Sequence, residues 1–145
     1  MLAFDLRDLE FQSDGLVDSL TLSMSPALFY ENLAREVATA QRESRDLTIA
    51  SISLNPKGFK GAAEFQEALI EIAFSIKNGL RGGDFFARIS DCGFWIFLRT
   101  DEAGASKVLT RLDLPRHKEL TINLVARKYF SVEHWINQVD QIHFS

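Results

Sequence analysis

Two short apolar runs separated by a tight polar turn are the feature that most limits how this chain can fold. Residues 85–89 and 94–98 are rich in phenylalanine and isoleucine, which favour strands. The four residues between them, Ser90-Asp91-Cys92-Gly93, have the length and composition of a turn. We therefore expect a β-hairpin, in which the two strands pair antiparallel as part of a sheet.

Before the hairpin, the sequence predicts a helix, a strand and a second helix. Ser25 and Pro26 supply the capping hydroxyl and the first-turn proline of a helix that should end within residues 42–45. Residues 47–54 alternate apolar with small polar side chains and favour a strand. Apolar residues at helical spacing then predict a second helix that ends near residues 78–79.

After the hairpin, the sequence predicts a third helix, a strand and a last helix. Thr100 or Asp101 can cap a helix that runs to about residue 112. Residues 120–126 favour a strand, and Ser131 can cap the last helix. This order of elements predicts an α/β (α+β) sandwich with a central, mostly antiparallel sheet flanked by helices.

The length and charge of the chain restrict its class. With 145 residues we expect one domain over residues 25–145, preceded by a lead segment over residues 1–24 that lacks a clean period. The formal net charge of -4 disfavours binding to nucleic acid or to acidic membranes, which requires a positive field. A single cysteine, no secretion signal and no span-length apolar run predict a cytoplasmic protein without direct membrane insertion.

A polar connection ahead of the hairpin carries the first candidate site. Arg81 and Asp84 stand three residues apart, and Gly82 and Gly83 between them leave room for a flat ring. A guanidinium can donate two bonds to guanine O6 and N7, pair with phosphate or stack on a base, and a carboxylate can accept from the guanine edge. The pair therefore suits a guanine nucleotide, although a surface ion pair of little energetic value is the alternative.

Several pieces of the chain, in order, resemble a GGDEF domain, the diguanylate cyclase fold that makes cyclic di-GMP from two molecules of GTP. The resemblance covers most of the chain, from about Asp18 to Asp140. Its pieces are Asp18-Ser19-Leu20-Thr21-Leu22 for the opening D-x-L-T-x-L, Phe59-Lys60 for the F-K pair, Arg81-Gly82-Gly83-Asp84 for the R-x-x-D inhibitory site, and Ala87-Arg88-Ile89 ahead of the signature. The R-x-x-D site also has the family's usual five-residue offset from the signature.

The chain departs from the family pattern where the family binds metal and phosphate. The resemblance puts Asn55 at the first metal-binding carboxylate, and Cys92 and Gly93 at the third and fourth residues of the signature. Ser90 and Asp91 stand at its two glycines, which otherwise let backbone amides approach phosphate. Magnesium takes several oxygen ligands, and a thiol is a poor substitute. We therefore expect no cyclase activity, no cofactor and no bound magnesium.

The loop with which the family recognises the guanine of GTP is also shortened. The segment between Lys60 and Arg81 lacks most of it, and Ala63 and Glu64 stand near the family's N-D pair. Because phosphoryl transfer depends on positioning and on metal, the loss of all three components excludes turnover. Residual GTP binding without turnover is the weakest alternative.

The surviving R-x-x-D site implies a receptor for cyclic di-GMP that signals through contact with a protein partner or through a homodimer. The resemblance gives Arg81, Asp84 and Arg111 as ligand residues, with Arg116 as the alternative to Arg111, and we add Arg88 as a second nearby cation. A scaffold or dimerisation module that binds no nucleotide is the competing hypothesis.

The cysteine and the histidines carry no recognisable chemistry of their own. Cys92 has no histidine near it in the sequence, and we interpret it as a structural residue of an exposed turn. His117, His134 and His143 lack the spacing of metal ligands, so we interpret them as surface or packing residues.

Overall fold

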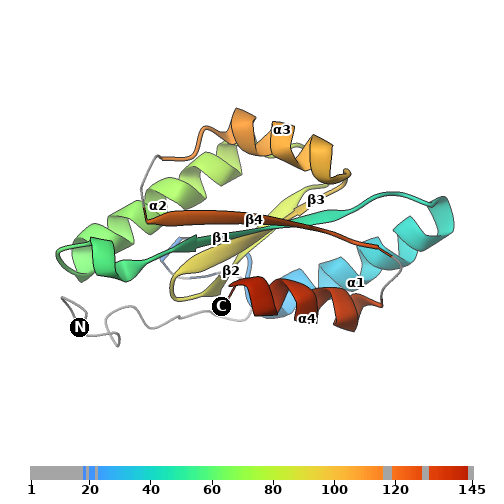
Figure 1. The fold of residues 1–145 in the computed structure, drawn as a ribbon, viewed down its shortest axis with the longest axis horizontal. Coiled ribbons are helices and arrows are strands. Elements are labelled where there is room, and N and C mark those ends of the chain that lie inside the picture. Colours follow the sequence, from blue (N-terminus) through green and yellow to red (C-terminus); the bar gives the residue numbers. More distant parts are fainter. Residues whose placement is uncertain (1–17, 19, 22, 116–118, 129–130, 144–145) are drawn as a thin grey trace.

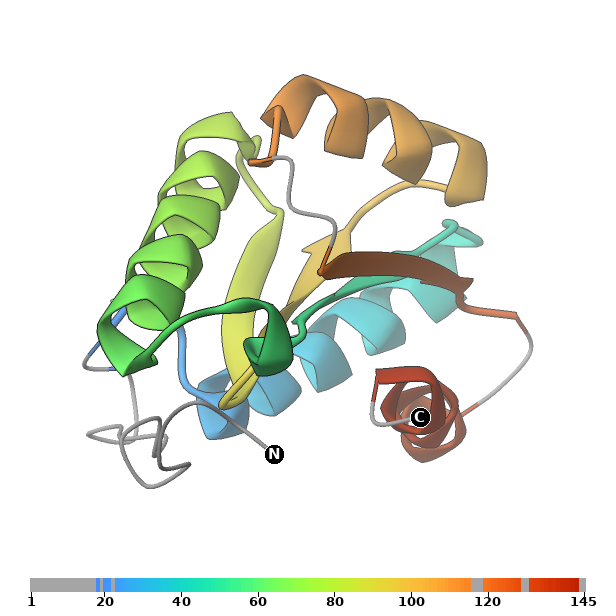
Figure 2. The same ribbon diagram turned by 60° about the vertical axis from the view of Figure 1, so that its left-hand side comes forward.

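An antiparallel sheet of four strands lies between two layers of helices (Figures 1 and 2). The structure is a computed structural model that describes residues 18, 20–21, 23–115, 119–128 and 131–143. Its elements in chain order are α1 (Pro26–Glu43), β1 (Thr48–Leu54), the 3-10 turn η2 (Pro56–Gly58), α2 (Ala62–Gly79), β2 (Phe85–Ser90), β3 (Gly93–Leu98), α3 (Glu102–Leu112), β4 (Leu120–Ala126) and α4 (Val132–His143).

The strands lie in the order β2-β3-β1-β4, and each neighbouring pair is antiparallel. The predicted hairpin is the pair β2–β3, and the predicted sandwich with an antiparallel central sheet is confirmed. All six residues of β3 are buried, because this central strand is covered on both faces. The register of β2 against β3 shifts at a bulge between Arg88 and Ser90.

Each face of the sheet packs against its own pair of helices. Phe94, Ile96 and Leu98 of β3 join the core under α2 and α3. Trp95 and Phe97, which alternate with them, join the core under α1 and α4. The alternation of large side chains along one strand therefore builds both cores of the domain.

The helix starts follow from local capping chemistry. The Ser25 hydroxyl accepts from the backbone N–H of Leu28 at 3.2 Å and caps α1, as predicted. The Asp101 carboxylate accepts from the backbone N–H of Gly104 at 2.8 Å, so Asp101 rather than Thr100 caps α3.

Only the end of the predicted lead segment belongs to the described part of the chain. Residues 1–17, 19 and 22 lie outside it. Asp18 and Ser23 are buried, and Met24 forms a parallel bridge with Ala87 of β2. Within the described residues, no helix is both long and apolar enough to cross a membrane.

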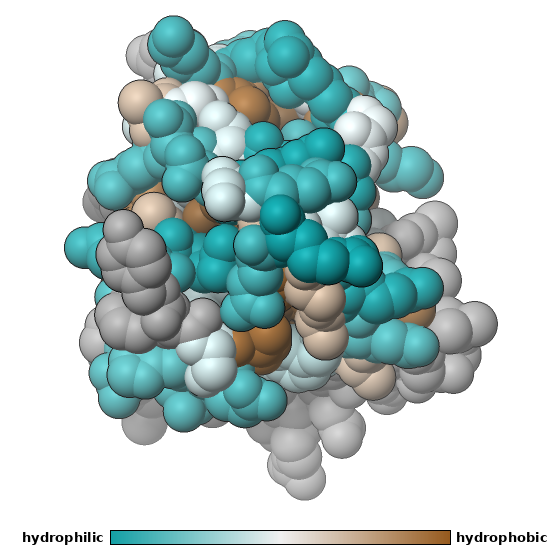
Figure 3. Space-filling view, turned by 90° about the vertical axis from the view of Figure 1, so that its right-hand side faces the viewer, coloured by the Kyte–Doolittle hydropathy of each residue, from teal (hydrophilic) through white to brown (hydrophobic). Residues whose placement is uncertain are grey.

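The end of the molecule at which α1 leads into β1, on the right of Figure 1, has a mostly hydrophilic surface (Figure 3). Large exposed apolar side chains occur elsewhere, on α2 and β4. Phe74 and Ile70 lie one turn apart on α2, with 66% and 44% of their surfaces exposed, and Ile122 on β4 is 40% exposed.

Candidate functional site

The connection between α2 and β2 forms a tight turn that presents Arg81 and Asp84. The backbone N–H of Asp84 donates to the carbonyl of Arg81 at 3.1 Å and closes this turn. Gly83 has a φ of 95°, a left-handed conformation that other residues rarely adopt. The two predicted side chains are therefore carried by one short, hydrogen-bonded loop.

A pocket of about 370 Å³ opens beside this turn and extends to α3. Arg81 and Asp84 line it from the turn, and Arg111 lines it from α3. The Arg111 guanidinium donates to the carbonyl of Gly79 at 2.9 Å, which holds it against the end of α2. The structure thus brings three of the four predicted ligand residues together, while Arg116 lies outside the described residues.

Two cations that the sequence reasoning missed also line this pocket, Lys107 from α3 and Arg99 from the end of β3. Lys107 stands four residues before Arg111, and this spacing, which puts both on one helix face, was available as a signal. Among the described lining residues, the pocket has four cations and one carboxylate, that of Asp84. Its charge therefore suits an anion.

The Asp84 carboxylate is held in place from the opposite strand. The backbone N–H of Arg99 donates to its Oδ1 at 3.1 Å. Burial raises the pKa of Asp84, while this hydrogen bond and the charges of Arg99, Arg111 and Arg81 oppose the rise. The carboxyl is thus oriented by a main-chain donor that does not depend on the Arg99 side chain.

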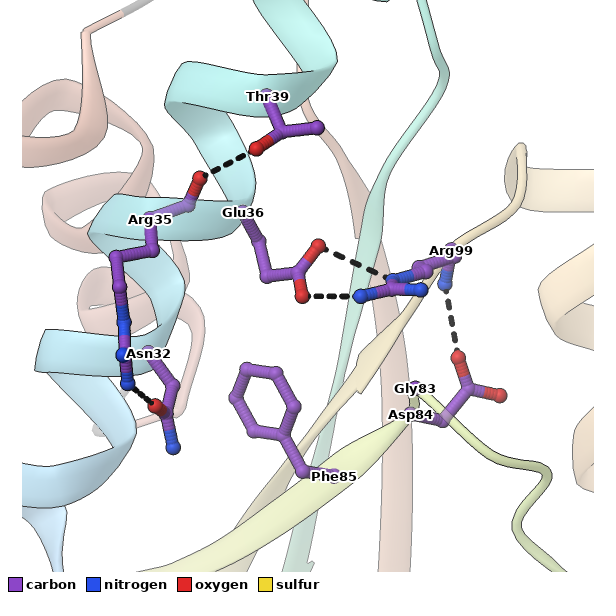
Figure 4. Close-up of a pocket in the computed structure, with 8 residues that line it drawn as sticks. All are labelled: Asn32, Arg35, Glu36, Thr39, Gly83, Asp84, Phe85 and Arg99. Atoms are coloured by element: carbon purple, nitrogen blue, oxygen red, sulfur yellow. Dashed lines mark hydrogen bonds and ion pairs between the residues drawn. The ribbon is translucent and has the colours of Figure 1, made fainter.

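A second pocket, of about 400 Å³, adjoins the first and shares Asp84 and Arg99 with it. Its other wall is α1, and Phe85 of β2 also lines it (Figure 4). Both oxygens of the Glu36 carboxylate, on α1, accept from the Arg99 guanidinium. Arg99 therefore lies between the two pockets and joins α1 to the end of β3.

The structure does not bring Arg88 to either pocket, and this corrects its predicted role as a ligand residue. Arg88 is 1% exposed, and its Nη1 lies 3.3 Å from a carboxylate oxygen of Asp18, which is fully buried. Its Nε and Nη2 donate to the carbonyls of Ser90 and Asp91 at 3.3 and 3.0 Å. The guanidinium therefore ties the lead segment to the hairpin turn inside the domain.

The signature turn after β2 lies at the other end of this strand from Arg81. Asn55, Ser90, Asp91 and Cys92 line a pocket of about 450 Å³ there. The Asn55 side-chain oxygen accepts from the backbone N–H of Lys57 at 3.0 Å and caps the short 3-10 turn. Cys92 is half-buried rather than exposed, which corrects the expectation for this turn.

His143, the last residue of α4, fills the space beside this turn. Its Nδ1 lies 2.6 Å from the hydroxyl oxygen of Ser51, and its Nε2 lies 3.0 Å from that of Ser90. A Cβ at Gly93 would lie 2.6 Å from the ring carbon Cε1 of His143 and 2.2 Å from the carbonyl oxygen of Ile52. Position 93 therefore has no room for a side chain.

The interpretation of His143 as a packing residue agrees with this burial, and His134 is exposed on the same helix. His117 lies outside the described residues. Burial lowers the pKa of His143, and the charge of Asp140 opposes this. The neutral form of the ring is thus favoured. Its two nitrogens, one a donor and one an acceptor, can both be hydrogen-bonded by the surrounding hydroxyls.

The pocket at this turn is lined by two carboxylates, Asp91 and Glu119, but positions 55, 92 and 93 supply no carboxylate for magnesium, which takes several oxygen ligands. The Asn55 oxygen already accepts a backbone hydrogen bond, and Gly93 offers no side chain. Burial and the charge of Asp91 raise the pKa of the Cys92 thiol, while Arg88 opposes this. Within the described residues, no group of three side chains drawn from His, Cys, Asp and Glu lies close enough together to hold a metal ion.

Comparison with known proteins finds matches by structure rather than by sequence. No family model matches the sequence, and no curated protein matches it. The GGDEF domain of DgcB from Caulobacter crescentus, solved in complex with c-di-GMP, superposes with a TM-score of 0.75 at 14% identity. That match covers 93% of this chain and 91% of the DgcB chain.

Two structures from Pseudomonas aeruginosa are similar to a comparable degree. The FimX GGDEF domain has a TM-score of 0.72 at 17% identity, and the match covers 88% of this chain and 91% of that chain. The diguanylate cyclase SiaD, in complex with its activator SiaC, has a TM-score of 0.72 at 20% identity over 88% of this chain. This chain spans 56% of that SiaD chain. The protein has the fold of a GGDEF domain.

Proposed function

We propose that this domain is a cytoplasmic receptor for cyclic di-GMP that binds the ligand at Arg81, Asp84 and Arg111 and signals by contact with a protein partner. The observation that carries the proposal is the meeting of these three residues, which the resemblance predicts as ligand residues, in one pocket with two further cations. Cyclic di-GMP offers two phosphates and two guanine edges, the groups that guanidinium and carboxylate side chains recognise.

The size and charge of the pocket support this ligand class. A cavity of about 370 Å³ is within the range of small-molecule sites. The adjoining pocket of about 400 Å³ shares Asp84 and Arg99 and extends the surface available to a dinucleotide. The solved structures in which GGDEF domains hold c-di-GMP make this ligand the first to test.

We further propose that the domain makes no cyclic di-GMP and binds no magnesium. This rests on the positions at which the family carries carboxylates, where Asn55 has an engaged amide, Cys92 a thiol of raised pKa and Gly93 no side chain, and where Asp91 and Glu119 are the carboxylates that line the pocket instead. A cyclase assay with GTP and magnesium should yield no product, and formation of cyclic di-GMP above the level of a protein-free blank would refute this part.

A scaffold or dimerisation module is the second candidate. It is favoured by Phe74 and Ile70, which are exposed one turn apart on α2 and present apolar surface to a partner. The two candidates differ in one measurement, because only the receptor binds the nucleotide.

The test is calorimetric titration of the full chain with cyclic di-GMP. We expect saturable binding that Arg81→Ala weakens at least about tenfold, since a charged hydrogen-bonding group is removed from the site. Arg42→Ala, an exposed change of the same type on α1, should leave the affinity unchanged. No binding by the wild type, or equal affinities for the wild type and Arg81→Ala, would favour the scaffold.

A further inference from the structure

Arg99 lies at the junction of three segments that are distant in the sequence. Its side chain pairs with Glu36 of α1, and its backbone N–H holds Asp84 of the turn before β2. It lines both pockets at this end of the sheet, as Figure 4 shows for the one against α1. One residue therefore touches the ligand pocket, the turn that carries its recognition pair, and α1.

The guanidinium lies directly against the recognition turn. A Cβ added at Gly83 would be 2.6 Å from Nη1 of Arg99, so the arginine covers the backbone between Arg81 and Asp84. Because Arg99 lines both pockets, rotation of its side chain can turn the guanidinium from α1 toward Arg81 while its backbone N–H stays bonded to Asp84.

The bond to Glu36 is one that an anionic ligand can replace. The Arg99 and Glu36 side chains are 39% and 21% exposed, so water already weakens their attraction. A phosphate oxygen pair offers the guanidinium the same two-point contact as a carboxylate, with Arg81, Lys107 and Arg111 nearby to strengthen the local positive field.

We infer that Arg99 is a switch residue of this site. A ligand phosphate replaces the Glu36 carboxylate as the partner of the Arg99 guanidinium. The site then contacts the ligand with one more cation, and the ion pair between α1 and the end of β3 is broken. The inference rests on the proposed function, since it needs a phosphate ligand in the Arg81 pocket. Glu36 then acts as an internal competitor that holds Arg99 when the ligand is absent. The output of the site is the release of α1 at Glu36.

Competition predicts that the two members of this pair affect binding in opposite directions. Glu36→Gln removes the competing carboxylate and should tighten cyclic di-GMP binding about two- to fivefold. Arg99→Ala removes a phosphate contact and should weaken binding about tenfold, while its backbone still holds Asp84. A pair that only stabilises the fold would give changes of the same sign for both variants.

The experiment is titration of the full chain with cyclic di-GMP for the wild type, Glu36→Gln, Arg99→Ala and Glu31→Gln. Glu31 is an exposed glutamate of the same helix, so Glu31→Gln controls for the general loss of one negative charge. Glutamine at position 36 keeps the size and shape of the partly buried Glu36 side chain, so this variant should fold like the wild type.

The outcomes separate this inference from the proposed function. The switch is supported if Glu36→Gln binds more tightly than the wild type while Glu31→Gln does not, and if Arg99→Ala binds more weakly. If the wild type binds and Arg81→Ala does not, but Glu36→Gln is unchanged or weaker, the switch is wrong and the receptor stands. If the wild type binds no cyclic di-GMP, both are wrong.

Discussion

The two ends of strand β2 differ in whether their charged and polar side chains are exposed to water or buried against partners. At its start, the turn at Arg81 and Asp84 opens on a pocket lined by four cations, several of them exposed to water. At its end, beside the pocket of about 450 Å³, the two basic side chains have partners inside the domain, because Arg88 is buried against Asp18 and His143 lies within hydrogen-bonding distance of serine hydroxyls.

The difference teaches how a binding region can be told from a packed one. A site that binds a ligand leaves its polar recognition groups near water, so these groups stay hydrated and destabilise the fold little when no ligand is bound. A region that satisfies its polar groups internally has made them part of the fold, since buried polar atoms require partners. The first end of β2 is therefore where substitutions should change binding, and the second end is where they should change stability.

The largest effect should come from the buried ion pair between Arg88, near the end of β2, and Asp18. Arg88→Ala leaves the Asp18 carboxylate buried without its charged partner and should cost about 3–5 kcal/mol of unfolding free energy. Urea denaturation measures this loss. Arg111→Ala at the open end, where the side chain is exposed, should cost less than about 0.5 kcal/mol.

A double variant separates lost charge pairing from lost packing. Arg88→Met with Asp18→Leu removes both charges and should recover much of the stability that Arg88→Ala loses. Equal losses for Arg88→Ala and Arg111→Ala would show that the two ends of β2 do not differ as described.

A smaller effect is expected from the glycine beneath His143. Gly93→Ala puts a methyl group 2.2 Å from the Ile52 carbonyl oxygen, so backbone must move and the variant should lose about 1–3 kcal/mol. Gly82→Ala is the matched change at the open end, where a Cβ meets nothing within 4 Å, and should stay within about 0.5 kcal/mol of the wild type. Thermal or urea unfolding of the two variants decides this, and a harmless Gly93→Ala would contradict the packing described.

The smallest effect should be a pH dependence from His143. Burial lowers the pKa of His143, so the unfolded chain binds this proton more readily than the folded one. The contribution of His143 to the unfolding free energy is therefore complete above about pH 6.5, the pKa of histidine in the unfolded chain. It is lost as the pH falls through that value toward the lowered pKa of the folded state.

Urea unfolding at pH 7.5 and pH 5.5 measures this dependence. His143→Gln should flatten the loss between the two pH values, whereas His134→Gln, a change at an exposed position of the same helix, should leave it as in the wild type. An identical pH profile for His143→Gln and the wild type would assign the dependence to other groups.

The fold could be predicted from the sequence because its signals are local. The Ser25 cap and the alternation in residues 48–54 each act within a few neighbouring residues, and the structure has the expected helix and strand there. The choice between Thr100 and Asp101 could not be made, because either side chain can cap and only the folded geometry selects Asp101.

The site could be predicted in part. Arg81 and Asp84 are close in sequence, and their shared turn follows from that. Arg88 was assigned wrongly because its partner Asp18 lies 70 residues away, and no local pattern reports such a pair. Arg99 was missed although the hairpin could have indicated it, because antiparallel pairing of β2 with β3 brings the residue that follows Leu98 beside Gly83 and Asp84.

The glycine at position 93 also limits which side chains the signature turn can carry. Any side chain there, a carboxylate included, meets the His143 ring and the Ile52 carbonyl. A single substitution cannot place an acidic residue there, because the His143 ring of α4 and the Ile52 carbonyl of β1 must first move. Position 93 can therefore gain a side chain only together with changes in α4 and β1, whereas Gly82 at the Arg81 end can be replaced alone.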